Sequence, residues 1–337
     1  MLARMSAGLC SVCGAALRDG VCPNGHPQRA SRLEARTTRG GFRRTLVWLL
    51  VLLLISGGVY AALVWYPRRA AADLMRPSSE EFAAALDAYR ATVATFPPGR
   101  TDPQVLIDGA DEVVTSAGQS RQEIGRASAR LEQREPVDLP VVSSRPPLRQ
   151  AVATREGMQA FYASALETVA SLEGIAGYVT SVAPVLPQLD NLEQRLGKPT
   201  AEEVGATVAA ATPIADQVVA DLRAITPPEE LGGLHASLVA IAQRIRADID
   251  ELARAGQQGS QPVVNATIQE IRAEIASFRE TLGRAPKEAA DAGLEDQKAE
   301  VDRLAENVIT GLETLRDTYG ITGLTVPPRA PPPITGV

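Results

Sequence analysis

The chain has 337 residues, enough for one large domain or two modest ones, and 45% of them are hydrophobic. Its net charge of −6 is unevenly distributed: residues 1–44 carry +6, from eight arginines against Asp19 and Glu34, and residues 67–337 carry −12. All three cysteines lie between positions 10 and 22, which excludes a disulfide framework from the rest of the chain.

A cysteine-rich motif occupies positions 10 to 26. Cys10 and Cys13 form a CxxC pair followed by Gly14, and Cys22 is followed four positions later by His26. Two cysteines at this spacing can bind one metal ion through a tight turn, and Cys22 and His26 would complete a tetrahedral set. We therefore predict that Cys10, Cys13, Cys22 and His26 bind one structural Zn²⁺ ion. The alternative is that the cysteines are free thiols on an arm without fixed structure.

Over residues 9–27 the arm resembles a short zinc ribbon of the kind found at the N-termini of many bacterial membrane proteins. The second half departs from the usual CxxC pair, because position 25 is glycine and the histidine follows one residue later. The resemblance implies a zinc ribbon-like domain over residues 1–28. Four protein ligands close such a site, so we expect no catalytic metal.

A basic juxtamembrane segment, residues 29–44, follows the motif. Its arginines recur mostly at three- or four-residue spacing, at positions 29, 32, 36, 39, 43 and 44. Arginines near an anionic membrane surface contribute ~1 kcal/mol each. Zinc ribbons also bind nucleic acid, but no aromatic residue for base stacking occurs in this segment before Phe42. We therefore expect the segment to contact the membrane surface rather than nucleic acid.

The stretch Thr45–Tyr66 contains no charged residue over 22 positions. A helix of this length covers about 33 Å, enough for a hydrocarbon core of ~30 Å. The two tryptophans of the chain, Trp48 and Trp65, lie near its ends, as interfacial aromatic residues do. A cleaved signal peptide has a shorter apolar region, of about 7–15 residues. We therefore predict one transmembrane helix over residues 45–66.

The arginine distribution predicts the orientation of this helix. Six arginines precede it within a short distance, whereas Arg68, Arg69 and Arg76 follow it. By the positive-inside rule the N-terminus is cytoplasmic, and residues 67–337 lie outside the cytoplasm. Small residues at Gly57 and Gly58 would allow another helix to approach closely, so we consider a homodimer through this face.

The rest of the chain has the periodicity of α-helices. We predict a first helical segment over 67–134, a proline-rich linker over 135–147, a main helical bundle over 148–320 and a disordered proline-rich tail over 321–337. The prediction is about seven helices and essentially no sheet, an all-α fold. The clearest helix face keeps strict 4-3 spacing through Leu106, Ala110, Val113, Ala117, Ser120, Ile124, Ala127 and Leu131.

Several local signals predict where helices begin and end. Capping boxes at Ser78–Glu81 and Thr200–Glu203 predict helix starts, as does Asp102 before a proline. Pro184 predicts a break or kink, and Pro213 predicts a kink.

The segment 222–235 resembles a helix–Pro-Pro–helix element of uncharacterised extracytoplasmic helical proteins, a resemblance that implies no activity. It ends at His235, which borders the apolar face of its helix. We expect this histidine to be packed and hydrogen-bonded rather than a metal ligand or a base.

The residue inventory of 67–337 predicts a protein that is not an enzyme. We find no serine elbow, P-loop or dinucleotide fingerprint, and the segment has one histidine and no cysteine. The sequence therefore favours a membrane-anchored binding or scaffold protein with an unknown protein partner. The alternative is a transmembrane sensor, whose bundle detects a ligand and signals through the span. An envelope hydrolase is disfavoured.

Overall fold

The computed structural model describes the following residues: 9–10, 12–17, 21–26, 39–96, 102–134 and 144–329. Within these ranges the regular structure is helical and contains no β-strand, so the predicted all-α class is confirmed. The chain divides into two compact units, Met1–Val59 and Tyr60–Val337, each of which is described by itself.

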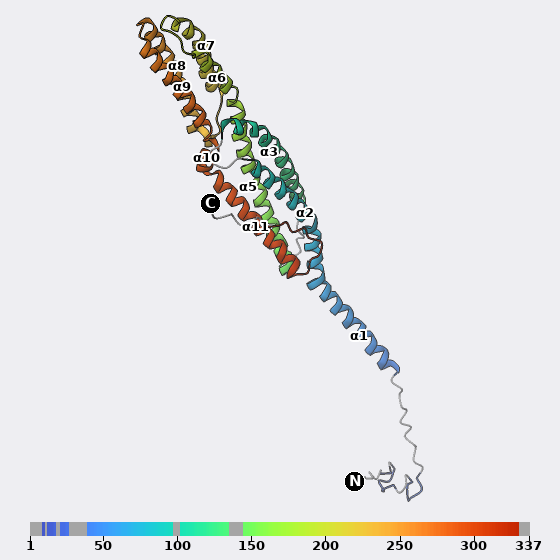
Figure 1. Ribbon diagram of the computed structural model, residues 1–337. Helices are drawn as coiled ribbons and strands as arrows, with labels where there is room; N and C mark the ends of the chain where they lie inside the picture. The colour runs from blue at the N-terminus through green and yellow to red at the C-terminus, as the bar shows by residue number, and fades with distance from the viewer. Residues whose placement is uncertain are drawn as a thin grey trace. The chain divides into compact units, whose positions relative to one another are not determined.

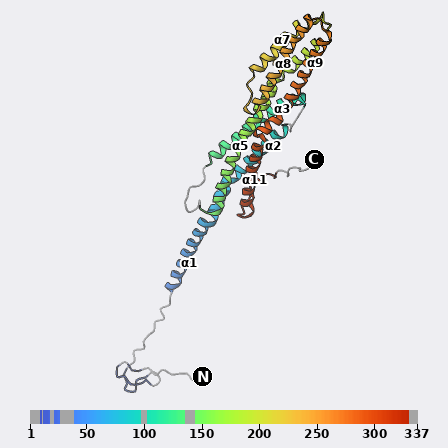
Figure 2. The same cartoon turned by 90° about the vertical axis from the view of Figure 1, so that its left-hand side faces the viewer.

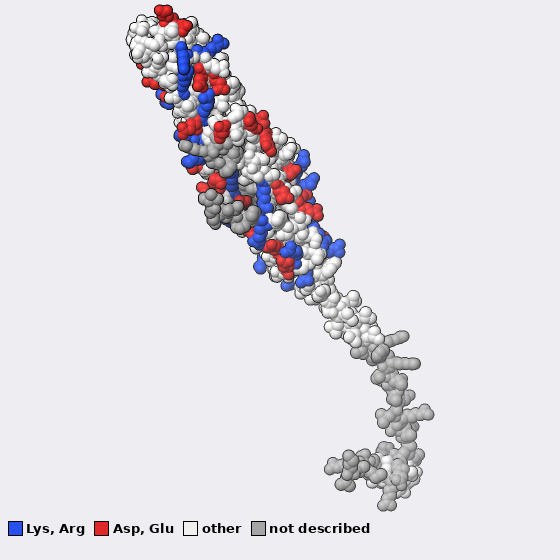
Figure 3. Space-filling model, viewed as in Figure 1, with Lys and Arg blue, Asp and Glu red and all other residues white. Residues whose placement is uncertain are grey.

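The first unit contains the cysteine motif and almost all of helix α1 (Arg39–Tyr60). The residues 46–60 of α1 are exposed, although most of them are large and apolar. In Figure 3 the part of α1 drawn in white shows neither acidic nor basic groups. A Cβ added at Gly57 or Gly58 would meet no atom within 4 Å, so nothing in the described chain covers this face.

Two helical stretches are long and apolar enough to cross a membrane, judged by length and composition alone. They are Leu46–Thr95 and Pro146–Leu196. The most apolar window of the first stretch has 0% of its residues buried, whereas that of the second is 50% buried. Burial of half the window is typical of a core helix in a helical bundle, whereas the exposed window of the first stretch is not part of any core.

The second unit contains seven described helices of 21 to 37 residues, as the sequence predicted. They are α2 (Tyr66–Thr95), α3 (Pro103–Glu132), α5 (Pro146–Val182), α7 (Val204–Ala224), α8 (Gly232–Gln257), α9 (Gln261–Leu282) and α11 (Glu295–Asp317). The shorter helical elements are η1 (Ala61–Trp65), α6 (Val185–Leu196), η2 (Glu229–Leu231), α10 (Ala285–Ala289) and η3 (Ala290–Leu294).

These helices enclose two hydrophobic cores, which we name by the helices at their edges. The α2–α11 core joins α2, α3, α5 and α11, and the α6–α9 core joins α6, α7, α8 and α9. Helix α5 contributes its first half to one core and its second half to the other, and Figures 1 and 2 both show it running between the two helix groups. The expected segments 67–134 and 148–320 therefore share a core.

Aromatic side chains lie at the centre of the α2–α11 core. The Phe161 ring packs edge-to-face against Phe82, with 5.0 Å between centroids, and against Tyr162, at 5.6 Å. Tyr89 lies on the same ring at 6.2 Å. Such pairs contribute ~0.5–1.5 kcal/mol beyond their buried area, so these four residues fix how α2 packs on α5.

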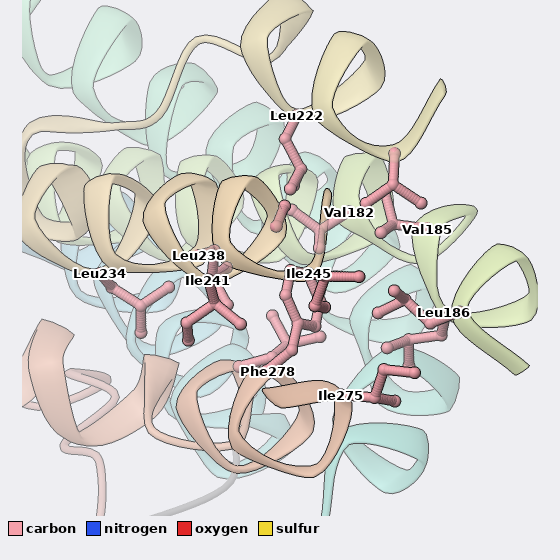
Figure 4. Close-up of a cluster of buried hydrophobic side chains, with 14 of the residues drawn as sticks. Val182, Val185, Leu186, Leu222, Leu234, Leu238, Ile241, Ile245, Ile275 and Phe278 are labelled. Atoms are coloured by element: carbon pink, nitrogen blue, oxygen red, sulfur yellow. The ribbon is translucent and has the colours of Figure 1, made fainter. Parts of the chain in front are cut away.

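Most side chains of the α6–α9 core are aliphatic. Figure 4 shows Leu238 and Ile245 of α8 directed toward Phe278 of α9. Leu222 of α7 and Val182 of α5 approach from the opposite side (Figure 4). Each of these side chains is buried, so the core is apolar throughout the region drawn.

The buried face of α3 is the one that the 4-3 spacing predicted. All eight predicted positions are buried, and they are the complete set of buried residues in this helix: Leu106, Ala110, Val113, Ala117, Ser120, Ile124, Ala127 and Leu131. Asp102 caps the helix as expected, because its carboxylate accepts a hydrogen bond from the backbone N–H of Gln104 at 2.9 Å.

Of two further boundary predictions, the one at Thr200 is met in part and the one at Pro184 is confirmed. The Thr200 backbone N–H donates to the Glu203 carboxylate at 2.9 Å, one half of a capping box, but a turn follows and α7 begins at Val204, with Glu203 as its N-cap. The chain breaks between α5 and α6 at Pro184, as its missing N–H predicted.

The predicted helix start at Ser78 is wrong, because α2 begins at Tyr66 and runs through it. Ser78 and Ser79 are buried in mid-helix, where their hydroxyls donate to the Leu74 and Arg76 carbonyls. Pro77 lies inside the same helix. Burial of the preceding turn in the α2–α11 core favours a continuous helix over the local capping pattern.

The chain after α11 differs from the expected disordered tail. Ile321 is buried in the α2–α11 core, and Leu324 and Val326 pack against the same core. Arg76 of α2 donates a hydrogen bond to the Thr322 carbonyl, and the Thr325 backbone N–H donates one to the Ser79 hydroxyl. The predicted tail beyond residue 329 and most of the linker 135–147 lie outside the described residues.

Candidate metal centre

The first half of the cysteine motif folds into a tight turn. The Gly14 backbone N–H donates to the Cys10 carbonyl at 2.9 Å, and the Cys10 N–H donates to the Ala15 carbonyl at 2.8 Å. An antiparallel β-bridge joins Leu9 to Ala16 outside this turn. Gly14 has φ of 68°, a left-handed conformation that glycine adopts without steric cost, which is why it follows the second cysteine.

The second half repeats this arrangement with a shorter turn. The Gly25 N–H donates to the Cys22 carbonyl at 3.0 Å, and Gly25 has φ of 69°. Because glycine occupies the turn position where a CxxC pair would have its second cysteine, the next side chain available is that of His26. The local fold therefore presents a histidine in place of a fourth thiol.

The four predicted ligands converge. The Cys13 and Cys22 sulfur atoms are 3.6 Å apart, and the Cys22 sulfur lies 3.6 Å from His26 Nδ1. One ligand atom from each of Cys10, Cys13, Cys22 and His26 lies within 4.8 Å of the others. A tetrahedral ion with bonds of about 2.3 Å to sulfur and 2.0–2.1 Å to nitrogen sets its ligands about 3.5–3.8 Å apart. The cluster therefore has dimensions that fit one metal ion.

The environment differs among the three thiols. Cys10 and Cys22 are buried, whereas Cys13 is exposed. Hydrogen bonds from the backbone at Val12 and Cys13 lower the pKa of Cys10 to about 6, so its thiolate form, the one that binds metals, predominates at neutral pH. Burial raises the pKa of Cys22, since a thiolate loses hydration there without gaining a counter-charge.

One polar neighbour of the cluster was not predicted from the sequence. The Asn24 amide nitrogen donates to the Cys13 sulfur at 3.8 Å. A donor to a ligating sulfur helps to orient it and offsets part of its negative charge. The position of Asn24 between Cys22 and His26 is consistent with such a role. A single polar residue in a turn is too common to predict it from the sequence.

The histidine outside the motif is packed, as predicted. The Tyr178 hydroxyl and His235 Nδ1 are 3.2 Å apart, and the two rings meet edge-to-face at 5.8 Å between centroids. Burial lowers the pKa of His235, which favours the neutral imidazole.

Comparisons with known proteins give no match for this chain. No protein-family model, no curated protein and no solved structure is similar to it. Any conclusion on function therefore depends on the cysteine cluster, the exposed apolar helix and the bundle.

Proposed function

We propose that the chain is a membrane-anchored binding or scaffold protein. Its N-terminal arm, with a structural zinc site, lies in the cytoplasm, and the helical bundle is an interaction domain on the other side of the cell membrane. The span over residues 45–66 joins them.

The observation that supports this proposal most is the exposed apolar surface of α1. The side chains of residues 46–60 are exposed, with Leu54 at 71% and Leu53 at 66%. Contiguous apolar surface of this extent marks a membrane or protein contact. The uncharged length matches a bilayer, and the aromatic residues Trp48 and Trp65 lie near its ends.

The chemistry of the cluster favours zinc among the metals that could fit. Three thiols and one imidazole form a soft, closed donor set, which suits a structural Zn²⁺ ion. A reducing compartment keeps such cysteines from forming disulfides. The cytoplasmic side, which the positive-inside rule predicts for the N-terminus, provides that condition.

The bundle supports a binding role through its surface. Figure 3 shows acidic and basic groups interspersed over the face in view, the pattern of a solvated exterior. Within the described part of the bundle beyond Tyr66, two large apolar side chains stand out as exposed, Val105 of α3 at 60% and Val263 of α9 at 40%. These positions offer the first places to look for a partner.

In vivo photo-crosslinking tests the proposal. A photoreactive amino acid at Val105 or Val263 should give a reproducible protein adduct from one partner, and the same residue at exposed Arg254 of α8 is the matched control. Equal labelling at all three positions, or none, would contradict a scaffold role. A sensor instead predicts a small ligand that raises the melting temperature of the full-length protein.

A further inference from the structure

A cavity lies where α2 begins. It has a volume of about 340 Å³, and its walls are the stretch from Trp65 to Arg76 and the residues that follow α11, from Gly320 to Thr322. The end of α11 is closed by a hydrogen bond from the Gly320 N–H to the Arg316 carbonyl at 3.1 Å, so that carbonyl is already paired.

The side chains around this cavity are predominantly cationic. Arg68, Arg69 and Arg76 line it against one carboxylate, Asp73. The Arg69–Asp73 ion pair is 3.8 Å long and its members are 62% and 66% exposed, so water and salt screen it. Arg68 has no hydrogen-bond or ion-pair partner in the part of the chain that the structure describes.

Two contacts hold the arginines in place. Arg76 Nε donates to the Thr322 carbonyl at 2.8 Å, which fixes one edge of its guanidinium. The Arg69 guanidinium lies over the Trp65 ring, 5.1 Å from its centroid. A guanidinium fork that is already oriented loses less entropy when it binds a planar or tetrahedral oxyanion.

The position of the cavity along the chain indicates the ligand. Trp65 is the penultimate residue of the proposed span, where indole rings settle at the depth of lipid headgroups. The bundle begins within the next turn, because Pro67 and Ala71 are buried. If residues 45–66 span the membrane, Trp65 and the cavity wall that it forms lie at the depth of the lipid headgroups.

The geometry points to a binding site for the phosphate group of an anionic phospholipid, in the leaflet on the bundle side. This inference depends on the proposed membrane anchoring. Arginine forks bind phosphate oxygens through paired charge-assisted hydrogen bonds. A soluble phosphate offers the same oxygens, so the test must separate the two sources.

The sequence provides a reporter for this test. Trp48 and Trp65 are the two tryptophans of the chain, so a Trp48→Phe variant leaves Trp65, in the cavity wall, as the single fluorophore. The full-length variant is placed in nanodiscs of phosphatidylcholine with brominated phosphatidylglycerol, or with brominated phosphatidylcholine at the same density. The measurement is the ratio of Trp65 quenching by the two brominated lipids.

We expect phosphatidylglycerol to quench Trp65 more strongly than phosphatidylcholine. Arg68→Gln should reduce the preference about fivefold, the equivalent of ~1 kcal/mol for one basic side chain at an anionic surface. Arg254→Gln makes the same charge change at an exposed position of α8 and should leave the preference unchanged. Arg76 is kept, since it also holds Thr322.

The remaining outcomes separate the possible failures. Equal quenching by both lipids would overturn the lipid site while leaving the membrane anchor intact, whereas no quenching by either would contradict the anchor itself. Inorganic phosphate is added to both kinds of nanodisc as a separate arm. If it shifts Trp65 emission in an Arg68-dependent way and abolishes the lipid preference, the site binds soluble phosphate and the lipid assignment is wrong.

Discussion

Arg76 Nε donates a hydrogen bond to the Thr322 carbonyl at 2.8 Å, across 246 positions of the sequence. This bond joins α2 to the chain that leaves α11. Ser79 adds a second bond nearby, accepting from the Thr325 N–H at 3.0 Å. The two ends of the bundle sequence are therefore fastened to each other on one side of the α2–α11 core.

Removing the Arg76–Thr322 hydrogen bond should increase local opening of residues 321–329 without unfolding the bundle. Arg76→Ala deletes a charge-assisted hydrogen bond at an exposed site, worth about 1 kcal/mol. Amide hydrogen exchange should rise by roughly fivefold over residues 321–329 and stay unchanged in α8 and α9. Arg303→Ala, which removes an exposed pair with Glu300, is the control. Equal exchange in both variants would show that the bond does not hold the segment.

A close approach of α7 and α8 makes Gly256 a sensitive position. A Cβ added there would meet Val204 Cγ1 at 2.6 Å and Val204 Cβ at 2.7 Å, and Val204 is buried. Gly256→Ala should therefore destabilise the bundle by ~1–3 kcal/mol through overpacking. Thermal unfolding followed by circular dichroism measures this as a melting temperature lower by roughly 2–4 °C per kcal/mol.

The matched control is a glycine with free space around it. A Cβ at Gly118 of α3 would meet no atom within 4 Å, so Gly118→Ala should stabilise the helix by about 0.5–1 kcal/mol. Destabilisation by both substitutions would mean that the helix spacing at Gly256 is not the cause.

The zinc assignment predicts a metal content for the protein. Full-length protein purified without chelator should hold about one zinc ion per chain, and Cys22→Ser should bring it well below half, because metal binding supplies the folding free energy of so short a segment. Elemental analysis measures both. Val12→Ala changes an exposed side chain of the same turn, 67% exposed, and should keep the metal. Wild-type protein with less than half an ion per chain would reject the assignment.

Burial of His235 predicts a pH dependence of stability. Its pKa is lowered from the ordinary 6.5, so the unfolded state binds the proton more tightly than the folded state. Its stabilising contribution is complete above the unfolded pKa and is lost as the pH falls below it. His235→Gln should therefore reduce the difference in urea midpoint between pH 7.5 and pH 5.

Tyr178→Phe provides the comparison for the histidine variant. It removes the hydroxyl bonded to His235 but keeps the ring that buries the imidazole. Because desolvation lowers the pKa, this variant should retain the pH dependence that His235→Gln loses. Loss of the dependence in both would assign it to the hydrogen bond instead.

Periodic and closely spaced features of this protein could be predicted from its sequence. The buried face of α3 was predicted because Leu106 and Leu131 belong to one uninterrupted 4-3 pattern, which a helix must place on one side. The metal ligands were predicted because Cys10 to His26 is a short span with few ways to fold around an ion.

The two wrong predictions, the helix start at Ser78 and the disordered tail from residue 321, concern features that have no such local pattern. Ser78 matches a capping box, but burial of the turns around it in the α2–α11 core favours a continuous helix. The segment after Ile321 is proline-rich and has no hydrophobic periodicity. Its contacts with Arg76 and Ser79 therefore could not be predicted from the local sequence. In both places, contacts between residues far apart in the sequence determine the local structure.

The orientation of the two arms is the central claim of this account, and cysteine accessibility in intact cells measures it most directly. The bundle has no native cysteine, so Ser237→Cys, at an exposed position of α8, places a single thiol there. A membrane-impermeant maleimide should label this variant in intact cells and leave the wild-type protein unlabelled until the membrane is permeabilised. Labelling of the wild-type cysteines in intact cells, with Ser237→Cys adding nothing until permeabilisation, would contradict the account.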